Sequence, residues 1–407
     1  MKKGWEIKKL GEVADIINGG TPKTNVLEYW DGDINWITPA DLGKLKNPEV
    51  EDTPRKLTKL GLDKSSAKLF PENSVILSTR APIGHLAINT APMSTNQGCR
   101  GIVPKEKLDF RFLYFFLKNN IDLLDSLGTG ATFKELSTKS LAGLVIPIPP
   151  LPEQQRIVSI IDECFTAIDQ AKANAEQNLK NARELFESYL QGVFANGKWE
   201  TRKIQEIAKV INGYAFASYD FNPTNKIKSV KITNVGVKEF IEDTDNYLPE
   251  KYKETLRDFQ VTEGNIVIAL TRTIISSGLK VAVVPSSYDG ALVNQRVAAL
   301  ISNEKLVNQN YLYLFLTTSY VAKYVLAHVN TLMQPNLSIS DLKNMSVPVP
   351  SLKEQNNIVV KLEELRTESQ KLKVLYQQKV ASLEELKKSI LKKAFAGELS
   401  TRDITLN

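Results

Sequence analysis

Two long stretches of the chain carry the same pattern of apolar and polar positions. Apolar or small residues recur at alternating spacings of four and three, from residue 157 to 189 and again from 358 to 390. This periodicity predicts two helices that each pack along one face against another helix. We expect the helix-pair interface to contain Ile157, Ile161, Ile168, Leu185, Ile358, Leu362, Leu365, Leu372, Leu383 and Leu386.

The expected partner of each helix is the other helix. Small residues of the first stretch, Ala171, Ala175 and Ala182, match bulkier residues in the second. A globular segment separates the two stretches, so an antiparallel pair is expected. At a rise of ~1.5 Å per residue, each helix would be about 66 Å long. The alternative is two independent amphipathic helices, each packed on its own domain.

The same junction precedes both helices. The chain reads LPEQQRIV at residues 151–158 and LKEQNNIV at residues 352–359, each after an apolar run interrupted by prolines. Both helical stretches end alike, in Val193-Phe194-Ala195 and Ala394-Phe395-Ala396. A strand, a sharp helix start and a long helix that occur twice at one offset indicate an internal duplication. Trp5 aligns with Trp199, so Phe395 and Trp5 are expected to lie close together.

The segments before the two helices also correspond. WEIKKLGEVADIING at residues 5–19 matches WETRKIQEIAKVING at residues 199–213, and later apolar strands recur while the loops differ. We therefore expect an α+β protein with two duplicated α/β domains, joined by the antiparallel coiled-coil helices with pseudo-twofold symmetry. The expected divisions are 1–150 (first domain), 151–196 (first helix), 197–350 (second domain), 351–397 (second helix) and 398–407 (C-terminal tail).

Polar groups recur after equivalent strands of the two domains. Arginine pairs with guanine and asparagine or glutamine with adenine in the major groove, while lysine suits phosphate contacts. The candidate DNA-binding residues are Thr21, Lys23, Thr38, Arg80, Asn96 and Gln97 in the first domain, and Lys231, Thr233, Arg272, Asn294 and Gln295 in the second. The competing interpretation is that the amides cap turns and the lysines are solvated.

The chain lacks the motifs of an enzyme of this size. The spacing at residues 192–198 resembles a phosphate-binding loop, but Trp199 occupies the Ser/Thr position. The two histidines, His85 and His328, stand alone, and no methyltransferase motif of the Asn/Asp-Pro-Pro-aromatic type occurs. The chain is expected to bind and not to catalyse, with no metal and no cofactor of its own.

Bulk properties narrow the class of protein further. The 407 residues exceed the size of an ordinary single core, and no apolar run is long enough to span a bilayer. The N-terminus lacks the apolar stretch of a signal peptide, and the two cysteines lie in unrelated contexts, which fits a cytoplasmic protein. A net charge of +6 permits binding of a polyanion without requiring it.

Taken together, these motifs resemble the specificity subunit of a type I restriction–modification system. The resemblance covers essentially the whole chain and rests on NGGTP at residues 18–22, STRAPIG at 78–84, NQG at 96–98 and IPIPPLPEQQRIV at 146–158. The second copy departs from it: Asn356-Asn357 replace Gln155-Arg156, and residues 213–216 read GYAF.

The resemblance implies two target recognition domains that each read half of a split sequence in double-stranded DNA, with the helix pair as spacer. It also implies two modification subunits that methylate adenine with S-adenosylmethionine. Restriction subunits, with an ATP-driven translocase and a nuclease, would join them. S-adenosylmethionine, ATP and Mg are then expected in these partner subunits only.

Two other functions compete with this interpretation. A structural adaptor that spaces two protein partners without reading DNA would share the helices, but it would not need divergent loops on duplicated domains. A self-sufficient restriction enzyme is disfavoured by the missing motifs.

Overall fold

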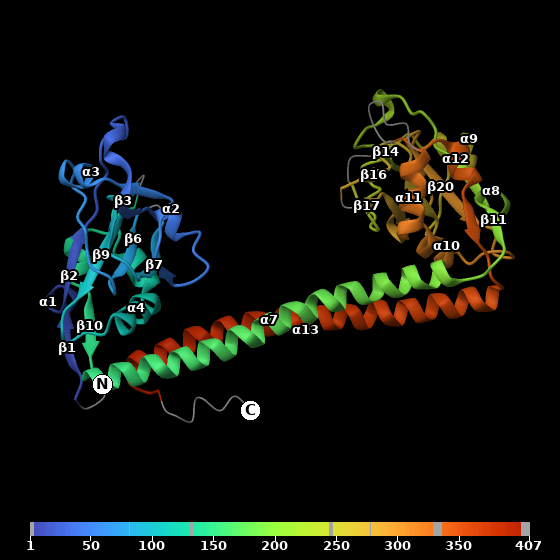
Figure 1. Cartoon of the computed structure of the whole chain (residues 1–407). Coiled ribbons are helices and arrows are strands. Elements are labelled where there is room, and N and C mark those ends of the chain that lie inside the picture. Colours follow the sequence, from blue (N-terminus) through green and yellow to red (C-terminus); the bar gives the residue numbers. More distant parts are fainter. Residues whose placement is uncertain are drawn as a thin grey trace. The chain divides into compact units, whose positions relative to one another are not determined.

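The computed structural model describes residues 4–80, 82–130, 134–243, 247–276, 278–328 and 336–399. The chain forms two compact units, the first comprising Met1–Glu176 with Gln378–Asn407 and the second Gln177–Gln377. Each unit contains one globular domain and a segment of each long helix (Figure 1).

The domain of the first unit is built on a five-stranded sheet and a smaller three-stranded sheet. The strand orders are β2-β9-β6-β7-β4 and β5-β3-β8. The strands are β1 (Glu6–Lys9), β2 (Ala14–Asn18), β3 (Trp30–Ile37), β4 (Glu49–Val50), β5 (Arg55–Leu57), β6 (Val75–Thr79), β7 (Ile83–Asn89), β8 (Met93–Thr95), β9 (Cys99–Pro104) and β10 (Val145–Ile148). The helices are α1 (Leu10–Val13), η1 (Leu27–Tyr29), α2 (Pro39–Leu42), α3 (Lys59–Asp63), α4 (Phe110–Asn119), α5 (Ile121–Ser126) and α6 (Thr138–Ala142).

The central strand β6 separates two hydrophobic clusters. Its residues are all buried, and successive side chains point to opposite faces of the sheet. Val75 and Leu77 join the cluster that contains α4, whereas Ile76 joins a second cluster with Phe70 and Met93. Because both faces of the sheet are covered here, the first three residues of β6 are apolar, and the two polar residues that follow them are buried as well.

The domain of the second unit repeats this plan with shorter strands. Its main sheet has the order β12-β20-β15-β18. The strands are β11 (Thr201–Lys203), β12 (Ala208–Asn212), β13 (Ile227–Val230), β14 (Tyr247–Leu248), β15 (Ile266–Ala269), β16 (Ile274–Ile275), β17 (Gly278–Leu279), β18 (Val281–Val283), β19 (Leu292–Val293), β20 (Val297–Ser302) and β21 (Ser346–Pro348). The helices are α8 (Ile204–Ile207), η2 (Ser218–Asp220), α9 (Tyr252–Thr255), η3 (Arg257–Phe259), η4 (Ser286–Tyr288), α10 (Gln309–Leu316), α11 (Ser319–His328) and α12 (Ile339–Asn344).

The duplication predicted from the sequence is confirmed strand by strand. The antiparallel series β2-β9-β6-β7 corresponds to β12-β20-β15-β18, and the parallel pair β3-β8 corresponds to β13-β19. In both units the proline-spaced strand before the long helix, β10 or β21, pairs with the first strand of the domain. Even the first helical turns match, since Glu12 and Glu206 each accept a hydrogen bond from the backbone N–H three residues earlier.

The two long helices, α7 (Leu151–Asn196) and α13 (Leu352–Ala396), pack against each other within each unit. In the first unit, Ile161 near the start of α7 shares a cluster with Ile390 near the end of α13. In the second unit, Leu190 near the end of α7 shares a cluster with Leu362 near the start of α13. Opposite ends therefore meet, and the predicted antiparallel pairing is confirmed (Figure 1).

The predicted interface does not hold at Leu185. That side chain is 46% exposed, whereas its neighbour Phe186 and Leu190 pack into the core of the second unit. An undistorted helix drifts by ~20° per heptad relative to a strict seven-residue repeat, so the buried face moves by about one position over four heptads. Of the other interface candidates, Ile157, Ile161, Ile168 and Leu362 are buried, and Ile358, Leu365, Leu372, Leu383 and Leu386 are half-buried.

A buried glutamine explains the repeated junction before the first helix. The Gln154 side chain is fully buried, and its Nε2 donates to the carbonyls of Lys107 (2.9 Å) and Pro149 (2.8 Å). Its Oε1 accepts from the backbone N–H of Asp109 (2.9 Å), the residue that caps α4. One amide thus joins the start of α7 to the start of the domain helix.

The second junction uses the same arrangement. The buried Gln355 donates to the carbonyls of Leu306 (3.0 Å) and Pro350 (2.8 Å). It accepts from the backbone N–H of Asn308 (2.7 Å), which caps α10. The glutamine is therefore the residue of the repeated motif that fixes the long helix to its domain.

The ends of the long helices are held by aromatic contacts that also recur. Phe395 packs edge-on against Phe112 and Phe116 of α4, with ring centroids 5.1 and 5.5 Å away. Phe194 packs at the corresponding place against Tyr311, with tilted rings, and edge-on against Phe315 of α10. Trp5 and Phe395 both pack against the hydrophobic core of the first unit, as expected for two residues in the same unit.

Among the described residues, no helix is long and apolar enough to cross a membrane.

Candidate nucleic-acid interface

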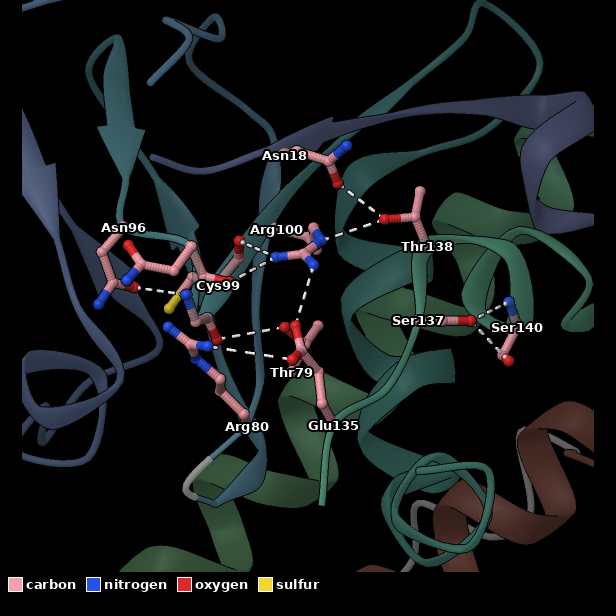
Figure 2. A network of polar contacts seen from close by, with 12 residues as sticks. Asn18, Thr79, Arg80, Asn96, Cys99, Arg100, Glu135, Ser137, Thr138 and Ser140 are labelled. Carbon is pink, nitrogen blue, oxygen red and sulfur yellow. Dashed lines mark hydrogen bonds and ion pairs between the residues drawn. The ribbon is translucent and has the colours of Figure 1, made fainter. Parts of the chain in front are cut away.

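In the first unit the candidate side chains meet where β6 ends and β9 begins (Figure 2). Arg80 directly follows β6, and Asn96 and Gln97 lie in the turn between β8 and β9. The backbone N–H of Thr79 donates to the carbonyl of Gly98 (2.8 Å), which brings the two segments together. A side chain at Gly98 would lie within 3.3 Å of Arg80 Nε and 2.9 Å of the Pro39 ring, so this close approach requires glycine.

A carboxylate lies between two arginines at this edge. Glu135 is 3.9 Å from Arg80 Nη1 and 3.4 Å from Arg100 Nη2. The Arg80 side chain is 35% exposed, whereas that of Arg100 is 10% exposed. Burial lowers the pKa of Arg100, and the charge of Glu135 opposes that shift. The buried arginine therefore supports the site, and the outer arginine presents its guanidinium to solvent.

Arg100 also holds the surrounding backbone. Its Nη1 donates to the carbonyls of Gln97 (2.8 Å) and Cys99 (3.0 Å), and its Nε donates to Thr138 Oγ1 (3.2 Å). Thr138 in turn donates to Asn18 Oδ1 (2.7 Å), so β2, β9 and the start of α6 are joined (Figure 2). This network positions the turn that carries the candidate amides.

Four of the six candidates in the first domain are brought together. Thr21 donates from its hydroxyl to Gln97 Oε1, and Asn96 Oδ1 accepts from the backbone N–H of Gly98 (2.9 Å). Asn96 therefore also shapes its own turn, which agrees with the competing interpretation that the amides cap turns. Gln97 is exposed.

The other two candidates of the first domain lie outside this network. Thr38 caps α2, exchanging hydrogen bonds with Asp41 through its backbone N–H (3.0 Å) and its hydroxyl (2.6 Å). The Lys23 side chain is exposed, and its carbonyl accepts from the indole of Trp30 (3.3 Å). Because Thr38 caps α2, a structural role is enough to explain a threonine at this position, and no ligand contact is needed.

The corresponding edge of the second unit is organised differently. Arg272 is exposed, has a left-handed backbone (φ 49°), and has no carboxylate partner among the described residues. Lys280 donates from Nζ to the carbonyl of Ile232 (2.9 Å). Burial, and secondarily the charge of Arg272, lowers the pKa of this lysine. Two cations therefore lie near one another without the glutamate found in the first unit.

The remaining candidates of the second unit surround this edge. Asn294 donates from its backbone to the carbonyl of Val230 (3.0 Å), and Gln295 is exposed. Lys231 places Nζ 4.1 Å from the ring centroid of Phe221, a cation–π contact, and Thr233 is exposed.

Sequence reasoning missed three residues of these sites: Arg100, Glu135 and Lys280. Arg100 interrupts an otherwise apolar strand, and a charge in a buried strand pattern is a signal for a paired site. Glu135 and Lys280 carry no such signal, because their roles depend on partners distant in sequence.

The described residues contain no cluster of three or more histidine, cysteine or acidic side chains that could hold a metal ion. Cys99 and Cys164 are buried, and burial raises the pKa of the Cys99 thiol far above its usual range. A thiol held protonated in this way is a poor nucleophile.

Comparison with known proteins places this architecture in a family. The family model for the type I restriction modification DNA specificity domain matches twice, at residues 2–181 and 196–377. The specificity subunit of the type I restriction enzyme MjaIX from Methanocaldococcus jannaschii is 27% identical, over 99% of this chain and 95% of the relative. The EcoKI specificity subunit of Escherichia coli K12 is 24% identical, over 99% of this chain and 90% of the relative.

The fold agrees with solved structures. The HsdS subunit from Thermoanaerobacter tengcongensis superposes with a TM-score of 0.67 at 19% identity, over 98% of each chain. A chain from a type I restriction–modification complex gives a TM-score of 0.72 at 19% identity, over 98% of this chain and 99% of the other. With two copies of the specificity domain spanning nearly its whole length, the chain belongs to the family of type I restriction–modification specificity subunits.

Proposed function

We propose that each duplicated domain reads one half of a bipartite sequence in double-stranded DNA, and that the helix pair sets the gap between the halves. The observation that carries this proposal is a shared scaffold with different polar groups at the same edge. Arg80 lies beside Glu135, whereas Arg272 has no carboxylate partner among the described residues. A duplicated adaptor would have no reason to vary this edge.

The chemistry of the two edges suits base readout. The charge of Glu135, 3.9 Å from Arg80, attracts the guanidinium toward this edge, and bidentate contact with guanine O6 and N7 would favour an arginine placed there. The exposed Gln97 and Gln295 suit adenine N6 and N7. Lys23 and Lys231 suit phosphates. Asn96 supports the turn that carries Gln97, while Thr21, Thr38, Thr233 and Asn294 stay candidates for contact.

The proposal extends to the assembly. The chain is non-catalytic and cytoplasmic, with recognition domains at residues 1–150 and 197–350 on spacer helices at 151–196 and 351–397. Two modification subunits dock on the helix pair, and restriction subunits join them. S-adenosylmethionine, ATP and Mg act in those partners.

The decisive experiment is reconstitution with the modification subunit of the same system. We expect methylation of a split motif and DNA binding that weakens steeply with salt. Exchanging the domain at residues 197–350 for that of another specificity subunit should change one half of the motif only. If the chain were an adaptor that ignores DNA, the reconstituted complex would methylate without sequence preference, or in a sequence that the modification subunit alone determines.

Replacing Arg80 or Arg272 by alanine tests the two edges separately. Each substitution should cost ~1–3 kcal/mol of binding to the preferred sequence and relax one position, in opposite halves of the motif. Binding to a library of randomised half-sites measures this, with the exposed Lys107→Ala as control. Uniform weakening across all sequences would assign a phosphate contact, and unchanged binding would make the arginine structural.

A further inference from the structure

The second unit contains a basic cavity that the DNA-reading edge does not use. It has a volume of about 250 Å³ and lies among α7, α10 and α13. Its lining includes Arg183, Arg366 and Lys373, together with Phe186, Tyr313 and Gln370. None of the three cations has an ion-pair partner within the described parts of the chain. The one carboxylate of the lining, Glu187, pairs with Lys238.

The first unit provides a natural comparison, because the two helices align without gaps from residues 151 and 352. The position of Lys373 corresponds to Lys172, and that of Arg183 corresponds to Glu384. In the first unit Lys172 and Glu384 form an ion pair between the helices (2.5 Å). In the second unit the acidic partner has become an arginine, so two cations occupy equivalent places.

At neighbouring positions, too, carboxylates of the first unit are absent from the second unit. The first unit has a second inter-helix pair, Lys387 with Asp169, whose counterparts in the second unit are Phe186 and Gln370. Phe165, which packs against the first core, is replaced by Arg366. At these five positions the first unit has two cations and two carboxylates, whereas the second unit has three cations and no carboxylate.

We propose that this cavity binds a phosphate group, either of a small polyphosphate ligand or of a DNA backbone. Three cations and no free carboxylate favour an anion, and two arginines supply the fork geometry that suits phosphate oxygens. The volume lies below the ~300–1,000 Å³ of ordinary small-molecule pockets, so it suits a phosphate or pyrophosphate rather than a whole cofactor. The site goes beyond the proposed base reading and does not depend on it.

Arg183→Glu tests the site with the full chain, because it restores the ion pair that the first unit forms at the same place. Pyrophosphate should bind the wild-type chain in calorimetry and raise its thermal midpoint relative to chloride at equal ionic strength. In the variant the affinity should fall on the order of tenfold or more. Arg366→Phe, which introduces the residue found at the equivalent position of the first unit, should weaken pyrophosphate binding to a similar extent. Lys392→Glu, on an exposed part of α13, is the control and should leave the affinity unchanged.

A second arm distinguishes the two sources of phosphate. If DNA supplies it, pyrophosphate binds neither protein, and Arg183→Glu reduces the salt dependence of DNA binding by the reconstituted complex by about one counterion. The base preference of the complex should stay unchanged in either case. A failure of the phosphate-site proposal can therefore be told apart from a failure of the proposed base reading. Equal pyrophosphate binding by wild type and variants, or no binding with an unchanged salt slope, overturns the proposal.

Discussion

Inserting one heptad into each long helix should widen the gap in the recognised motif by about three base pairs or abolish tight binding. The insertions belong after Glu176 and Gln377, where the chain divides into its two compact units. Seven residues lengthen a helix by ~10 Å, close to three steps of B-DNA at about 3.4 Å each. Three base pairs also rotate the duplex by roughly 100°, so both domains need not meet the major groove together.

The methylated motif of the reconstituted complex measures the result. An insertion after Glu176 alone is the control, because α7 would then have seven residues without a counterpart in α13 at the division between the units, which should impair folding; helix pairs inside a unit, such as Lys172 with Glu384, keep their register. Full activity at the original spacing would refute the helix pair as the element that sets the gap. The partner subunits would then position the domains.

Gln154→Leu should destabilise the first unit by about 2–4 kcal/mol. The substitution keeps the volume but leaves the backbone N–H of Asp109 and the carbonyls of Lys107 and Pro149 buried without their partner. Each unsatisfied group costs ~1–3 kcal/mol, and the groups share one site, so the losses do not simply add. Unfolding in denaturant and amide exchange at Asp109 measure the loss.

The adjacent Gln155→Leu is the matched control, since that side chain is exposed. It should change stability by less than ~0.5 kcal/mol. Gln355→Leu should reproduce the effect in the second unit, with the exposed Asn357→Leu as its control. Equal effects of Gln154→Leu and Gln155→Leu would show that the buried hydrogen bonds contribute little.

The helices and the duplication could be predicted because their signals are local and periodic. The four-three spacing identifies an interface without any knowledge of the partner, whereas the role of the glutamine in the repeated junction depends on backbone groups 45 and 47 residues away. Leu185 marks the limit of that inference. Its heptad position is apolar, yet Phe186 lies on the buried face because the helix follows its own 3.6-residue period.

The sequence by itself determined that the chain holds two copies of one α/β scaffold, each followed by a long helix. The periods of strands and helices are written in consecutive residues, so these features need no tertiary information. Only the tertiary structure decided that Glu135 lies between Arg80 and Arg100, that Thr38 caps a helix, and that Arg183 faces the same cavity as Lys373. Such pairings depend on how distant segments pack, because a side chain's charge acts on whatever lies within a few ångströms, wherever that neighbour stands in the chain.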